Sequence, residues 1–179
     1  AAAAASAAPS SSTNSSSSSA ASASRCCARQ SLSWWRPEGT QALAETRNGE
    51  LRHALAIKLL EVAELGEQEI NLHPLITTIT ALVDKKHIST HLWFCSHFDC
   101  SEYIELFTRV VIQNETEAYV EALSVFENMQ GPIAANTKQS VIDSLSQYVA
   151  GLEEDHYKKP VIPELIALIT ELPTDEKSV

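Results

Sequence analysis

The first 37 residues of the chain contain no acidic residue. They include thirteen serines, eleven alanines and three arginines, whereas all twenty-three Asp and Glu residues lie from Glu38 onward. An acid-free segment rich in serine and alanine and bearing arginine is typical of a mitochondrial or chloroplast transit peptide. We therefore separate a low-complexity, transit-peptide-like leader, residues 1–37, from residues 38–179. We expect the leader to direct the protein to the mitochondrion, with the chloroplast as the alternative.

The chain also lacks any long apolar run. A membrane-spanning helix needs about 18 or more consecutive apolar residues, and no such run is present, so we expect no membrane span. The four cysteines, Cys26, Cys27, Cys95 and Cys100, lack the even spacing of a secreted disulfide scaffold. We interpret them as reduced thiols.

Positive charge is scarce beyond the leader. Residues 38–179 hold ten basic residues against all twenty-three acidic ones, which is a net charge of −13. Non-specific affinity for nucleic acid comes mainly from Lys and Arg, so this balance disfavours RNA unless lysines gather in a local patch. The candidates for such a patch are Lys85, Lys86, Lys158 and Lys159. The acidity favours a basic protein partner instead.

No segment alternates convincingly between apolar and polar residues as a half-buried strand does. The first helix is expected to run from its N-cap, Asn48, to Leu65, with Gly66 just past its end. Its apolar face consists of residues three and four positions apart: Leu51, Leu55, Leu59, Val62 and Leu65. The β-branched content of residues 76–80 leaves a strand as the alternative there.

Start and stop residues predict the other helices. Pro74 suits a first helical position, Asp99 and Glu102 have the spacing of a capping box, and Gly131 is expected as a left-handed C-cap. The expected helices span residues 74–83, 87–94, 99–113, 114–129, 137–152 and 163–172. Six or seven helices joined by short turns predict an all-α domain of helical hairpins, arranged as a bundle or a short solenoid.

One stretch has a more specific order of residues. Residues 121–129 read EALSVFENM, a turn containing Gly131 follows, and Thr137 opens the next helix before Val141 and Ile142. This order resembles the pentatricopeptide repeat family over about residues 103–145. The resemblance implies helical-hairpin repeats and, as an alternative function, a short RNA-binding or ribosome-associated protein.

The densest group of metal-ligating residue types lies between residues 87 and 100. On one helix, His87, His91 and Cys95 would lie one turn apart, and Cys100 would return from the next turn to complete a tetrahedral zinc site. In the alternative, Cys95 is a buried apolar group, His97 lies on the surface and His87 ends a helix. We favour the alternative, and expect no cofactor, because the spacing matches no common zinc motif.

No phosphate loop, catalytic triad, dinucleotide fingerprint or family-spaced metal motif is present in the sequence. We therefore expect no enzyme but a helical scaffold or accessory subunit of a larger organellar protein assembly. Its partners are expected to be other protein subunits. Trp34 and Trp35 are the expected docking residues, because exposed tandem tryptophans usually insert into a groove. The exposed helix faces within residues 103–129 and 137–152 are expected to contribute further.

Overall fold

The computed structural model describes residues 38–65, 70–83, 87–115 and 117–175, which all lie in one compact unit, Arg36–Val179. Most of this part of the chain is helical and its strands are two residues each, so the predicted all-α fold is confirmed. Its elements are α2 (Glu38–Glu45), α3 (Gly49–Glu64), α4 (His73–Leu82), α5 (Ser89–Cys95), the 3₁₀ helix η2 (Ser101–Tyr103), α6 (Ile104–Gln113), α7 (Glu117–Glu127), β1 (Ile133–Ala134), α8 (Ala135–Ala150), α9 (Val161–Glu171) and β2 (Thr174–Asp175).

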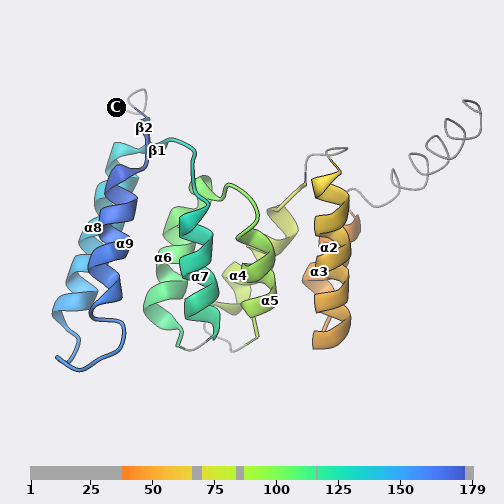
Figure 1. The fold of residues 1–179 in the computed structure, drawn as a ribbon, viewed down its shortest axis with the longest axis horizontal. Coiled ribbons are helices and arrows are strands. Elements are labelled where there is room, and N and C mark those ends of the chain that lie inside the picture. Colours follow the sequence, from red (N-terminus) through yellow and green to blue (C-terminus); the bar gives the residue numbers. More distant parts are fainter. Residues whose placement is uncertain (1–37, 66–69, 84–86, 116, 176–179) are drawn as a thin grey trace, which may run out of the picture. The chain divides into compact units, whose positions relative to one another are not determined.

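Successive helices pair as hairpins, and the hairpins stack in chain order (Figure 1). The pairs are α2 with α3, α4 with α5, α6 with α7, and α8 with α9. First helices contact first helices, as α2 does α4 and α6 does α8, while α3, α5, α7 and α9 contact one another in sequence. The result is a short solenoid in which each hairpin is stabilised by its neighbours.

One apolar core runs through the stack. Its largest side chains, Phe94, Phe107 and Phe126, are fully buried and come from α5, α6 and α7 respectively. Burying a side chain of this size stabilises the fold by about 1.5–3 kcal/mol. Because these three helices belong to adjacent hairpins, the rings join the middle of the stack into one unit.

Several local predictions are confirmed. Asn48 caps α3, and its side-chain oxygen accepts a hydrogen bond from the Leu51 amide at 3.1 Å. Pro74 lies in the first turn of α4, where its missing N–H costs no helical hydrogen bond. The strand alternative for residues 76–80 is wrong, because these residues lie within α4. Gly66 lies outside the described residues.

The predicted capping box at Asp99 is wrong. The helix begins with η2, and the Asp99 carboxylate accepts hydrogen bonds from the Ser101 amide at 3.1 Å and the Gln130 amide at 3.2 Å. Asp99 therefore links the start of η2 to the turn after α7. Gly131 is not left-handed; a Cβ there would lie 2.9 Å from Asp99 Oδ2 and 3.2 Å from Ser101 Cβ. A glycine suits this position because a side chain would crowd Asp99 and Ser101, and not because the backbone is left-handed.

Two elements of the described residues have no counterpart in the sequence predictions. The first is α2, whose one large buried apolar side chain, Leu43, is too little to produce a helical pattern. The second is a parallel pair of two-residue strands in which Ile133 lies opposite Thr174 and Ala134 opposite Asp175. Pairing between residues so far apart has no local signature. It joins the start of α8 to the end of α9.

None of the helices in the described ranges combines the length and apolarity needed to cross a lipid bilayer. The expected absence of a membrane-spanning helix therefore agrees with this part of the structure.

Candidate functional site

The outer side of α3 exposes large apolar side chains. Among the described residues, five large apolar side chains are exposed, and three of them belong to α3 or its C-cap: Leu51 at 61%, Ile57 at 39% and Leu65 at 67%. The exposed Ala54 and the ion pair between Lys58 and Glu61, 2.7 Å apart, lie on the same helix. We name these six residues, Leu51, Ala54, Ile57, Lys58, Glu61 and Leu65, the α3 face.

The α3 face exists because the covered side of the helix is rotated from the one that its sequence predicted. Leu59 is buried as predicted, but Ala56 and Leu60 are buried as well, whereas Leu51 and Leu65 are exposed. The buried side chains lie under α2 and α5, the two helices that contact α3. The helix carries apolar residues around much of its circumference, so the side left outside combines apolar side chains with charged ones.

The two ends of the stack differ in the chemistry they present to solvent. At the far end, the exposed residues of α8 are mostly polar: Asn136, Gln139, Ser140, Asp143, Ser144, Ser146 and Gln147. A solenoid end that faces water needs such a polar outer side. The α8 end meets this requirement, and none of the large apolar side chains of α8 is exposed. The α3 end meets it only in part, because Leu51, Ile57 and Leu65 are exposed among charged side chains. The α3 face is therefore the strongest candidate for a protein-binding surface in the described residues.

Next to the α3 face, His91 lies buried in the corner between α2, α3 and α5. Its side chain is 2% exposed and neither ring nitrogen makes a hydrogen bond. Burial, together with the nearby Arg52 guanidinium, lowers the pKa of His91 to about 4, while the backbone of Leu43 and Ala44 acts in the opposite direction. His91 is therefore a neutral core residue at pH 7.

Arg52, on α3, connects the backbone segments around His91. Its guanidinium donates hydrogen bonds to the carbonyl oxygens of Thr46 at 2.9 Å, His87 at 3.0 Å and Arg47 at 3.3 Å. These oxygens lie in the α2–α3 loop and just before α5. Arg52 thereby holds the terminal hairpin against the next one.

The four candidate zinc ligands do not gather. His87 is exposed, whereas His91, Cys95 and Cys100 are buried. In the part of the chain that the structure describes, no group of three or more His, Cys, Asp or Glu side chains is arranged to hold a metal ion. The alternative assignment, with Cys95 in the core and His97 on the surface, is confirmed.

The two buried thiols interact with each other and with the backbone. The Cys100 thiol lies 3.5 Å from the Cys95 carbonyl oxygen and donates to it. Hydrogen bonding to Cys100, with burial, raises the pKa of Cys95 well above its usual value. A nucleophilic cysteine needs the opposite, a lowered pKa and access to solvent. We therefore interpret the two thiols as buried core residues.

Lys158, one of the four lysines considered for a basic patch, is buried. It is 1% exposed, and its Nζ donates hydrogen bonds to the carbonyl oxygens of Val111, at 2.9 Å, and Asn114. The rings of three tyrosines surround the same nitrogen, with centroids at 4.8, 5.6 and 5.8 Å: Tyr119, Tyr148 and Tyr157. Burial lowers the pKa of Lys158, and the Glu115 carboxylate acts in the opposite direction. This lysine caps the C-terminal end of α6 instead of facing a phosphate.

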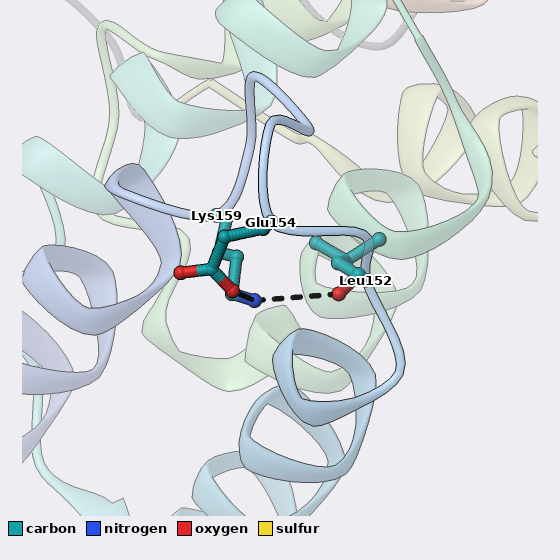
Figure 2. A network of polar contacts seen from close by, with 3 residues as sticks. All are labelled: Leu152, Glu154 and Lys159. Carbon is teal, nitrogen blue, oxygen red and sulfur yellow. Dashed lines mark hydrogen bonds and ion pairs between the residues drawn. The ribbon is translucent and has the colours of Figure 1, made fainter.

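The neighbouring Lys159 is held by its own loop. Figure 2 shows its Nζ directed at the Glu154 carboxylate and at the Leu152 carbonyl oxygen, 3.4 Å away. Lys85 and Lys86 lie outside the described residues. Lys158 and Lys159 therefore do not form the kind of basic patch that RNA binding would need.

A hollow of about 290 Å³ lies between α6 and α8, within the ranges 103–129 and 137–152 where exposed faces were expected to bind. Its lining includes Arg109, Thr108 and Ser140 together with Glu105. These groups offer polar contacts and one charge of each sign. Trp34 and Trp35, the expected docking residues, lie outside the described residues.

The chain matches no protein-family model, no curated protein and no solved structure.

Proposed function

We propose that this protein is a non-enzymatic helical scaffold, an accessory subunit of a larger organellar protein assembly, and that it binds a protein partner through the α3 face. The observation that supports this function is the difference between the two ends of the stack. Three large apolar side chains are exposed at the α3 end, whereas the α8 end is polar. Apolar surface at the end of a solenoid is stabilised when another protein covers it.

The organellar location in this proposal rests on the composition of residues 1–37, which contain arginine but no acid. Trp34 and Trp35 remain candidates for additional docking residues, because tryptophan side chains often dominate binding energy at protein interfaces.

The alternative is a short pentatricopeptide-like protein that binds RNA or associates with the ribosome. It is supported by the order of residues 121–145 and by Arg109 with its neighbouring hydroxyl groups in the hollow between α6 and α8. The net charge of −10 and the burial of Lys158 disfavour it. A local basic surface would be needed for RNA to bind.

Affinity purification of the tagged protein from its own cells tests the proposed function. We expect the wild-type chain to recover a defined set of proteins, with a mature N-terminus inside or just after residues 1–37. The double variant Leu51→Glu and Ile57→Glu should lose those proteins while keeping its helical circular dichroism spectrum. Val120→Glu is the matched control, because Val120 is 55% exposed but lies on α7. Equal recovery by all three proteins would contradict the role of the α3 face.

A further inference from the structure

The α3 face has the spacing of a coiled-coil seam. Leu51, Ala54, Lys58, Glu61 and Leu65 follow one another at steps of three, four, three and four residues. All five residues are exposed. Such a row forms one continuous line along a helix and is the pattern with which one helix packs against another. The row therefore has the form of a helix-pairing surface without a helix against it in the described residues.

The centre of this row is charged and its ends are apolar. Lys58 and Glu61 form an ion pair whose side chains are 72% and 54% exposed, an arrangement that contributes little stability in water. The pair carries one positive and one negative charge at adjacent positions of the row. A surface of this kind complements a second copy of itself only in one orientation.

That orientation is antiparallel. If the row of a second copy runs in the opposite direction, with the two-fold axis between residues 59 and 60, Lys58 lies opposite Glu61 of the second copy and Ala54 lies opposite its Leu65. The position opposite Leu51 then falls beyond Leu65, outside the described residues. Each contact then occurs twice, as symmetry requires. A parallel pairing in register would place Lys58 against Lys58 and Glu61 against Glu61, which is unfavourable.

We infer that the partner of the α3 face is a second copy of this chain, bound antiparallel through α3. The inference rests on the proposed function in that it names the partner of the same protein-binding surface. The net charge of the chain also supports pairing of two copies through the α3 face rather than through another surface. A chain with a net charge of −10 repels its own copies over most approaches, whereas the α3 row carries balanced charges.

The size of the surface sets the strength of the dimer. Helix α3 has sixteen residues and is therefore about 24 Å long. One helix pair of this length buries less area than a standard stable interface, so the dimer belongs to the weak class that dissociates on dilution.

The test is the mass of the purified full-length chain by analytical ultracentrifugation, between about 1 and 200 µM, a range that covers weak association. We expect two chains per particle at the high end and one at the low end. Lys58→Glu alone and Glu61→Lys alone should each weaken association by at least about tenfold, because each places like charges opposite each other twice. An equimolar mixture of the two variants should associate again, since every pair is then opposite in sign.

Recovery in the mixture also shows that both variants fold. Val120→Glu is expected to leave the dimer unchanged. A wild-type chain that stays a single chain at every concentration overturns the inference, as does a dimer that neither charge reversal weakens. These outcomes are distinct from failure of the proposed function, because a monomeric chain that still loses its cellular partners on Leu51→Glu and Ile57→Glu retains the α3 face as a site for a different protein.

Discussion

Among the described residues, two side chains that carry or can carry positive charge, Lys158 and His91, are buried, and their surroundings differ. Lys158 keeps its proton, because two carbonyl oxygens accept from it and three tyrosine rings surround it. His91 has no hydrogen-bond partner, so burial favours its neutral form. The first arrangement stabilises a charge inside the fold, and the second makes the fold sensitive to acid.

His91 makes stability depend on pH in a defined window. Its pKa is about 4 in the folded chain against 6.5 for an ordinary histidine, so the unfolded chain binds the extra proton first as pH falls. Its contribution is complete above about pH 6.5, declines as pH falls to about 4, and amounts to about 3 kcal/mol in total. Urea unfolding at several pH values measures it.

The variant His91→Leu should remove this part of the pH dependence, because leucine does not titrate. His97→Leu is the control, since His97 is exposed and should leave the dependence between pH 6.5 and 4 intact. If wild type and His91→Leu lose stability in parallel over this window, His91 does not titrate as described.

Removing the buried charge of Lys158 should destabilise the fold. Lys158→Met leaves the carbonyl oxygens of Val111 and Asn114 buried without their donor, which is expected to lower the free energy of unfolding by about 2–4 kcal/mol. Lys159→Met is the control, because Lys159 bonds a fully exposed Glu154 side chain and its loss should have a much smaller effect. Equal losses in the two variants, measured by urea unfolding, would refute the capping role of Lys158.

At the scale of elements, the packing of α2 on α3 depends on a glycine. A Cβ at Gly39 would lie 2.6 Å from Cδ2 of Leu59, a buried side chain of α3. A side chain at that position would therefore have to displace the buried Leu59 side chain or move α2 away from α3. Because α2 contacts both α3 and α4, its position affects one partner helix in each of the first two hairpins.

This close approach predicts opposite effects at two glycines. Gly39→Val should destabilise the chain by about 1–3 kcal/mol, because the added atoms overpack a closed contact. Gly49→Ala is the control: a Cβ there has no neighbour within 4 Å, and alanine favours the helix by up to about 1 kcal/mol. Thermal unfolding of both variants provides the comparison, and a neutral Gly39→Val would show that α2 can shift away without cost.

At the scale of the whole molecule, the excess of acid opposes compactness. The net charge is −10, so carboxylates repel one another across the folded chain. Raising NaCl from about 0.05 to 0.5 M shortens the screening length, and the midpoint of thermal unfolding should rise by about 2–4 °C. The same change at about pH 5, where carboxylates begin to take up protons, should have less effect. A midpoint that falls with salt at pH 7.5 would mean that attractive ion pairs outweigh the repulsion.

The class of the fold and several of the helix start positions follow from the local sequence. Asn48 and Pro74 lie where predicted, because a cap or a proline acts on amides within one helical turn. The same local rules failed at Asp99 and Gly131, whose contacts join the start of η2 to the turn after α7. A prediction based on neighbouring residues cannot include that contact, because the two segments are far apart in the sequence.

Only the tertiary structure decided which sides of the helices are covered. Of the apolar row predicted on α3, only Leu59 is buried, together with Ala56 and Leu60, whereas Leu51 and Leu65 at the ends of that row face solvent. Likewise, no local pattern predicts that three tyrosines and the end of α6 enclose Lys158. Both outcomes depend on contacts between helices that are distant in the chain. The residue types limit which of these contacts can form, but they do not specify which ones do.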